Sequence, residues 1–270
     1  MRLRGLDFDV RVEGDPAGEP IVLLHGFPQH AGAWDKVWPP LVDAGHRVVL
    51  PDQRGYSPGA RPSSPRAYSG TELAGDVLAL LDELGLPSAH VVGHDWGGGV
   101  AWALASAFPE RVRTLTAVST PHPRAMLTAS QAVRSWYMGA FLVPAVPERV
   151  LLASRARMLR QMLRSSGLPR DAADAYADRM AEPGALTAAL NWYRGLPYSR
   201  PAIGRIDVPT LYVWGDRDVA LGPTAAAGTG RWVRGPYTFV PLRGTGHWIP
   251  ELAPDALLGP LLDHVRRYSS

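Results

Sequence analysis

The sequence of 270 residues contains no cysteine, which excludes disulfide bonds and thiolate chemistry. It also lacks any run of about 18 consecutive apolar residues, so we expect no membrane-spanning segment and no membrane partner. Residues 1–7 contain neither the long apolar run nor the small-residue cleavage site of a signal peptide. The location predicted by default is therefore the cytoplasm.

An excess of charge of one sign is also missing, because the formal net charge is only +3 and the arginines are scattered. The densest basic stretch, 155–164, has the spacing of one helix face and is not interleaved with stacking aromatic residues. We therefore expect no nucleic-acid partner. With 46% hydrophobic and 20% charged residues, the composition is typical of a globular protein with a substantial core.

Short apolar runs alternate with amphipathic segments along much of the chain. Runs without polar alternation are typical of strands covered on both faces, and strands that alternate with helices favour a parallel sheet with right-handed crossovers. The predicted fold class is therefore α/β, with a mostly parallel central sheet flanked by helices. The predicted strands are 21–24, 47–50, 89–92, 112–119, 210–214 and 237–242, and the predicted core helices are 71–84, 96–108 and 256–268.

This alternation stops between residues 122 and 205, where prolines punctuate a helical pattern and no buried strand is predicted. The segment is too long for one crossover connection. We expect it to form an α-helical cap, residues 122–205, inserted between two parts of an α/β core, 1–121 and 206–270. The alternative is that it contains additional crossover helices.

The strongest chemical signal is Gly93-His-Asp-Trp-Gly97, where a predicted strand runs directly into a predicted helix. This is the pattern of a nucleophile elbow with aspartate in place of serine. The two glycines allow a sharp turn from which a side chain projects, and the helix offers unpaired N–H groups to an anion. Asp95 is therefore the candidate nucleophile. The alternative is that Asp95 only caps the helix.

A histidine and two aspartates follow the elbow in the order that this arrangement requires. His247 lies in a glycine-rich loop, and Asp216 and Asp218 follow the predicted strand 210–214. A catalytic histidine needs a carboxylate that fixes its tautomer and supports its charged form. We assign this role to Asp218, which lies deeper in the loop, with Asp216 as the alternative. Two further polar residues are expected to be structural: Asp52 and His94.

The segment His25-Gly-Phe-Pro28 follows the first predicted buried strand. It can be interpreted as a simple tight turn or as part of an oxyanion hole. In the second interpretation, which we prefer, the backbone N–H groups of Phe27 and Trp96 stabilise a tetrahedral intermediate.

Together these motifs resemble the epoxide hydrolases of the α/β-hydrolase superfamily, the branch with an aspartate nucleophile. The resemblance covers nearly the whole chain and rests on His25-Gly-Phe-Pro28, Asp52-Gln-Arg-Gly-Tyr56, Gly93-His-Asp-Trp-Gly-Gly98, Ser119-Thr-Pro-His-Pro123 and Gly246-His-Trp248. Epoxide hydrolases carry two cap tyrosines that face the nucleophile. The resemblance implies Tyr137 and Tyr193, with Tyr198 as a lesser candidate for the second position. The alternative role for these tyrosines is aromatic packing.

An aspartate nucleophile suits displacement at a saturated carbon, because its ester can be hydrolysed whereas a serine would form a stable ether. The resemblance implies that Asp95 opens an epoxide, that tyrosine protonates the leaving oxygen, and that His247 activates water to hydrolyse the ester. No metal or organic cofactor is needed. The apolar cap favours a bulky hydrophobic epoxide, and we expect a monomer or homodimer. The predicted substrate contacts are Trp136, Phe141 and Trp192, with Met138 nearby.

Three other functions stay open at this point. Haloalkane dehalogenases use the same aspartate elbow, but they often place asparagine where Phe27 stands here, and a halide has no use for a tyrosine pair. Fluoroacetate dehalogenases resemble the chain at His25-Gly-Phe-Pro-Gln29 but place arginine where Trp96 stands. A non-catalytic ligand-binding protein is the third alternative, because fold alone does not decide function.

Overall fold

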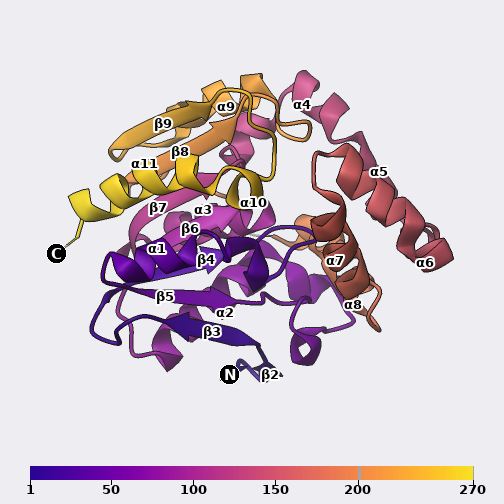
Figure 1. The fold of residues 1–270 in the computed structure, drawn as a ribbon, viewed down its shortest axis with the longest axis horizontal. Helices are drawn as coiled ribbons and strands as arrows, with labels where there is room; N and C mark the ends of the chain where they lie inside the picture. Colours follow the sequence, from indigo (N-terminus) through magenta and orange to yellow (C-terminus); the bar gives the residue numbers. More distant parts are fainter. Residues whose placement is uncertain (200–201, 270) are drawn as a thin grey trace.

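The computed structural model describes residues 1–199 and 202–269 and contains a seven-stranded sheet in the order β3-β5-β4-β6-β7-β8-β9 (Figure 1). Every neighbouring pair in it is parallel except β3 and β5. The strands are β3 (Val10–Glu13), β4 (Glu19–Leu24), β5 (His46–Pro51), β6 (Ala89–His94), β7 (Val112–Val118), β8 (Thr210–Gly215) and β9 (Tyr237–Leu242), and a separate hairpin joins β1 (Arg2–Leu3) to β2 (Leu6–Asp7). The predicted α/β fold with a mostly parallel sheet is confirmed.

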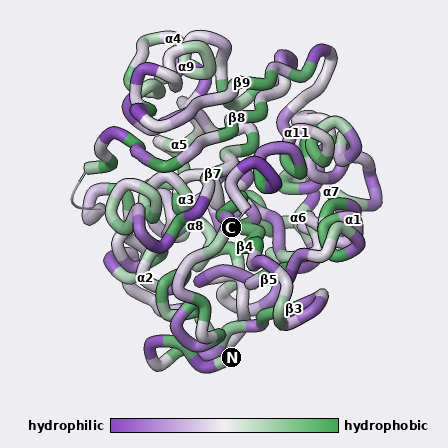
Figure 2. The backbone as a smooth tube through the Cα atoms, turned by 90° about the vertical axis from the view of Figure 1, so that its left-hand side faces the viewer, coloured by the Kyte–Doolittle hydropathy of each residue, from purple (hydrophilic) through white to green (hydrophobic). Residues whose placement is uncertain are grey.

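Two hydrophobic cores lie on opposite faces of this sheet. In β4, Val22 and Leu24 belong to one core, whereas Ile21 and Leu23 belong to the other, and all four are fully buried. Because successive side chains of a strand point to opposite faces, a strand covered on both faces needs an unbroken apolar run. Figure 2 shows this run as a green segment at β4.

Helices cover both faces of the sheet. Apolar residues of α2 (Gly70–Glu83) and α3 (Trp96–Ala107) complete the first core, and those of α1 (Trp38–Asp43) and α11 (Pro254–Arg267) complete the second. The short helices of this part are α9 (Pro223–Gly228) and α10 (Ile249–Leu252). The 3-10 turns of the chain are η1 (Ala31–Trp34), η2 (Pro58–Ala60), η3 (Pro65–Tyr68), η4 (Pro109–Arg111), η5 (Pro123–Met126), η6 (Leu196–Tyr198) and η7 (Thr229–Trp232).

Between β7 and β8, the described residues form helices and turns but no strand. The helices are α4 (Ala129–Arg134), α5 (Trp136–Phe141), α6 (Val146–Ser165), α7 (Arg170–Met180) and α8 (Ala185–Gly195), and α6 is kinked at residues 153–156. Figure 1 shows α5 to α8 beside one end of the sheet, across from α11. This arrangement supports the expectation of a helical cap, while its bounds at residues 122 and 205 stay a prediction.

Polar contacts fasten these helices to the strands and loops of the core. Arg179 of α7 forms an ion pair with Asp52, whose other oxygen accepts a hydrogen bond from the Ala31 N–H at 2.7 Å. Trp192 of α8 donates its indole N–H to the Arg54 carbonyl at 2.9 Å. Asp52 therefore has the structural role expected for it. No helix in the described part of the chain combines the length and apolar character needed to span a membrane.

Candidate active site

Asp95 occupies a sharp bend between β6, which ends at His94, and α3, which begins at Trp96. Its backbone has φ +50° and ψ −120°, a conformation that L-residues seldom adopt, and its side chain does not cap α3. The flanking glycines are required by space, because a Cβ on Gly93 would lie 2.2 Å from the Gly97 carbonyl oxygen. At this bend the Asp95 side chain does not cap the helix and is therefore available as a nucleophile.

The Asp95 carboxylate is held by two groups from other loops. Its Oδ1 accepts the Phe27 N–H at 2.8 Å, and its Oδ2 lies 3.5 Å from Nε2 of His247. Burial alone would raise the pKa of the Asp95 carboxyl, but the hydrogen bond and charge of His247 outweigh burial and lower it. Asp95 is therefore anionic at neutral pH, as a nucleophile must be.

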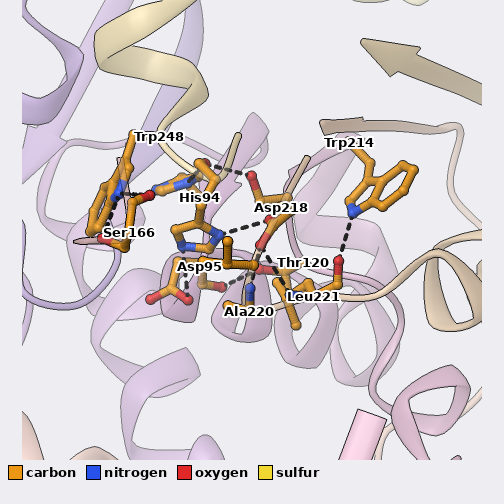
Figure 3. Close-up of polar contacts among 12 residues, drawn as sticks. His94, Asp95, Thr120, Ser166, Trp214, Asp218, Ala220, Leu221 and Trp248 are labelled. Atoms are coloured by element: carbon orange, nitrogen blue, oxygen red, sulfur yellow. Dashed lines mark hydrogen bonds and ion pairs between the residues drawn. The ribbon is translucent and has the colours of Figure 1, made fainter. Parts of the chain in front are cut away.

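Asp218 orients His247 from the opposite side. Its Oδ2 lies 2.8 Å from His247 Nδ1, and its Oδ1 accepts the N–H groups of Ala220 and Leu221 at 2.8 and 3.0 Å. Figure 3 shows Asp218 next to Ala220 and Leu221. Burial lowers the pKa of His247, but Asp218 and Asp95 together raise it well above its usual value. Asp95, His247 and Asp218 thus form a continuous acid–base chain.

Asp216, the alternative acid, is exposed and its carboxylate accepts the Gly244 N–H at 2.7 Å. No contact between Asp216 and His247 is found among the described residues. The structure therefore favours Asp218 as the partner of His247, and it gives Asp216 the role of fixing a turn in the histidine loop.

The family follows from this geometry together with the sequence, since the profile of the alpha/beta hydrolase fold matches residues 19–254. The chain belongs to the α/β-hydrolase family. It is 35% identical to the AB hydrolase superfamily protein YfhM of Bacillus subtilis, with 98% of this chain and 96% of that relative covered. It is 32% identical to epoxide hydrolase A of Mycobacterium tuberculosis, with 97% and 94% covered.

A solved structure shows the same relationship. The crystal structure of epoxide hydrolase A from Mycobacterium thermoresistibile matches this chain with a TM-score of 0.88 at 29% identity, covering 100% of this chain and 98% of the other. The resemblance to epoxide hydrolases drawn from the motifs is therefore confirmed as a similarity of sequence and of fold.

The loop after β4 in this α/β-hydrolase is built around the nucleophile. A Cβ on Gly26 would lie 2.3 Å from the Asp95 Cβ, so only glycine fits there, and this close approach brings the Phe27 N–H to the carboxylate. Trp96 opens α3, and its N–H is one of the first four in that helix, which have no acceptor within the helix. The Phe27 part of the predicted oxyanion hole is thus in place, and the Trp96 part stays a prediction.

The loop that follows β7 fixes the backbone of the site. The Thr120 hydroxyl donates to the Asp95 carbonyl at 2.6 Å, and the Ser119 hydroxyl donates to the His247 carbonyl at 2.9 Å. These bonds explain the segment Ser119-Thr-Pro-His-Pro123, because its two hydroxyls hold the backbones of the candidate nucleophile and base. Figure 3 shows Thr120 beside Asp95.

A buried polar chain behind the site was not predicted from the sequence. Gln29 lies at its centre: its Oε1 accepts the Gly26 N–H at 2.6 Å and lies 2.9 Å from His94 Nδ1. Its Nε2 donates to Glu251 at 2.6 Å, and the same Glu251 oxygen accepts the Tyr176 hydroxyl at 2.8 Å. These hydrogen bonds connect α7 to the loop that holds Asp95.

His94 belongs to this support. Its Nε2 lies 2.9 Å from the His247 carbonyl, and burial lowers the pKa of His94 to about 4. The ring is therefore neutral and has one N–H, which donates to either the Gln29 oxygen or the His247 carbonyl, in agreement with the structural role expected for it.

A cavity of about 600 Å³ opens above the Asp95 carboxylate. Its wall is mostly apolar and includes the predicted substrate contacts Trp136 and Phe141, together with Tyr193 and His247. Trp192 does not line this cavity. It lines a second cavity of about 440 Å³ with Trp96, so its predicted contact with substrate is not supported by the structure.

The three candidate tyrosines lie in different places relative to the catalytic cavity, and the side chain of one is not described. Tyr193 of α8 lines the catalytic cavity, with its ring centroid 5.7 Å from that of Phe27 and 4.8 Å from that of Trp96. Tyr137 lies on α5, but its side chain is outside the described residues. Tyr198 is half exposed beneath the Arg66 guanidinium, which places it at the surface.

Proposed function

We propose that this α/β-hydrolase converts a hydrophobic epoxide into a vicinal diol through a covalent Asp95 ester. One observation carries the proposal: an anionic carboxylate projects from a strained bend into an apolar cavity, within reach of a histidine that is paired with a second carboxylate. The similarity to epoxide hydrolases over nearly the full chain supports the substrate class.

In the first step, Asp95 Oδ2 attacks one carbon of the epoxide, and the carbon–oxygen bond to the ring oxygen breaks. Oδ1, which already accepts the Phe27 N–H, becomes the carbonyl oxygen of the new ester. The ring oxygen takes a proton from a tyrosine, since a phenol is a far stronger acid than an alcohol. Tyr193 is the candidate donor, and Tyr137 stays the predicted second one.

In the second step, His247 accepts a proton from a water molecule that attacks the ester carbonyl carbon. Ester formation removes the negative charge of Asp95, which is one of the two anions that raise the pKa of His247. The pKa of His247 falls after the ester has formed, and the ring can then pass its proton to the tyrosinate left by the first step. His247 therefore becomes a competent base only at this point. Negative charge then develops on Oδ1, where the Phe27 N–H stabilises it. When this intermediate collapses, the bond from the Asp95 carbonyl carbon to the substrate oxygen breaks, the diol oxygen takes the proton from His247, and the Asp95 carboxylate is regenerated.

A single turnover in ¹⁸O-labelled water tests this route. With enzyme in excess over styrene oxide, the diol should contain no solvent oxygen, because its new oxygen comes from Asp95, and the label should appear in the peptide that contains Asp95. Mass spectrometry of both products gives the result. Solvent oxygen in the first diol formed would contradict the covalent route, and halide release from haloalkanes without diol formation would favour a dehalogenase.

Replacing Tyr193 with phenylalanine should lower kcat/KM for styrene oxide about 10- to 100-fold. General acid catalysis typically contributes about 10²- to 10⁴-fold, and a second tyrosine is predicted to share the task. The ring contacts with Phe27 and Phe141 do not need the hydroxyl, so circular dichroism should show that the variant is folded. Tyr198→Phe is the matched control and should keep full activity. Unchanged turnover by Tyr193→Phe would assign Tyr193 to packing alone.

A further inference from the structure

Arg134, the last residue of α4, lines the cavity that contains Asp95 and His247. Among the described residues that line this cavity, it is the only arginine or lysine. A guanidinium stays protonated under all ordinary conditions, so it gives the cavity a permanent positive charge. The role proposed above for the cavity does not use this charge.

The hydrogen bonds of Arg134 do not account for its position. The same nitrogen, Nη1, donates to the carbonyls of Asp218 and Val219 at 3.4 and 3.3 Å, both beyond the usual N–H···O range. No carboxylate is paired with Arg134 among the residues that the structure describes. Arg194 of α8 is different, because two of its nitrogens contact Glu148 at 2.7 and 3.1 Å.

Apart from Asp95 and His247, the rest of the cavity wall is mostly apolar. Helix α6 contributes apolar side chains from both sides of its kink, namely Val146, Val150, Leu151, Met158 and Met162. The residues at the opening, Trp136 and Val219, are 75% and 54% exposed, so a ligand can reach the cavity beside Arg134. An exposed arginine that lines an aliphatic cavity is complementary to a molecule with an apolar chain and an anionic group that stays at the surface.

We propose that Arg134 binds the carboxylate of the substrate, and that the substrate class is epoxides of fatty-acid type, with an aliphatic chain and a carboxylate. This inference rests on the proposed function and makes it more specific. The planar guanidinium of an arginine suits a two-point contact with a carboxylate. The aliphatic chain lies along α6 while the epoxide reaches Asp95. Arg134 is then a specificity residue, since it contacts the substrate away from the reacting atoms.

Turnover of cis-epoxystearic acid and of its methyl ester tests the assignment, because the two substrates differ only in the negative charge. In Arg134→Gln, kcat/KM for the acid should fall about 10- to 100-fold, mostly through KM, because a hydrogen bond to a charged group is lost from both ground and transition states. The value for the methyl ester should stay within about twofold. Arg134→Lys should recover part of the preference, since it keeps the charge without the planar fork.

Arg149→Gln is the matched control, because Arg149 is an exposed arginine on α6 that does not line the cavity. It should leave the ratio of acid to ester turnover unchanged. An equal loss of both activities in Arg134→Gln, or no change in the ratio, would overturn the assignment.

Binding of decanoate, measured by titration calorimetry, separates this inference from the proposed function. Wild-type protein should bind decanoate at least about 10-fold more tightly than Arg134→Gln, whether or not any epoxide is hydrolysed. Equal affinities would overturn the role of Arg134. Absence of diol from every epoxide, with the decanoate difference retained, would overturn the proposed reaction and leave the carboxylate site in place.

Discussion

Replacing Asp95 with asparagine should lower the rate of epoxide hydrolysis by about 10⁶-fold, the loss typical of removing a covalent nucleophile. The fold should survive, because an asparagine oxygen can still accept the Phe27 N–H and asparagine tolerates positive φ better than most residues. What disappears is the anion, since a neutral amide is a poor nucleophile towards a saturated carbon. The measurement is diol formation from styrene oxide by freshly prepared protein.

Asp216→Asn is the matched control for this experiment, because it removes a carboxylate from the neighbouring loop that does not contact His247. It should keep nearly full activity. Intact mass must be followed in parallel, since slow deamidation of the introduced asparagine would regenerate the nucleophile and activity would increase with storage. Substantial activity in undeamidated Asp95→Asn would remove Asp95 from the centre of the reaction.

The elbow and its partners could be predicted because their chemistry depends on local sequence. A strand, a glycine, an aspartate and a second glycine in direct succession have few other uses, and the structure brings Asp95, His247 and Asp218 together. The choice of Asp218 over Asp216 was less certain from sequence, because both follow β8 closely. Only the three-dimensional path of the loop, in which Asp218 is buried and Asp216 is exposed, separates them.

The polar chain through Gln29 could not be predicted for the opposite reason. Gln29 and Glu251 are 222 residues apart, and Tyr176 comes from α7. Neither of the two core residues lies in a motif that demands a partner. The contact between Gln29 and Glu251 depends on how the loop after β4 packs against α10, and the contact of Tyr176 depends on how α7 packs there. No local pattern in one sequence encodes these distances.

Trp192 and Tyr193 show that the sequence also does not predict which of two neighbouring helix residues faces a cavity. Neighbouring residues of a helix point about 100° apart, so both cannot face the same cavity squarely. The helical pattern alone does not decide which of two aromatic residues faces the nucleophile. In the structure Tyr193 lines the catalytic cavity, whereas Trp192 faces the second cavity and donates its N–H to Arg54.

Replacing His247 with glutamine should stop the reaction at the ester. Glutamine cannot accept a proton from water, so hydrolysis should slow by about 10⁴-fold or more, whereas attack by Asp95 does not need a base. Loss of the His247 charge removes the main cause that lowers the pKa of Asp95, so this pKa should rise. A mildly alkaline buffer therefore keeps Asp95 ionised and favours ester formation.

The trapped ester should appear as protein heavier by the mass of one epoxide, with the added mass located on the peptide that contains Asp95. The double variant Asp95→Asn, His247→Gln should show no such adduct, which separates alkylation of the nucleophile from alkylation elsewhere. Release of diol by His247→Gln at the wild-type rate would show that another group activates the water. Absence of adduct with an epoxide that the wild type converts would instead break the two-step scheme, because a carboxylate still held by the Phe27 N–H should then have reacted.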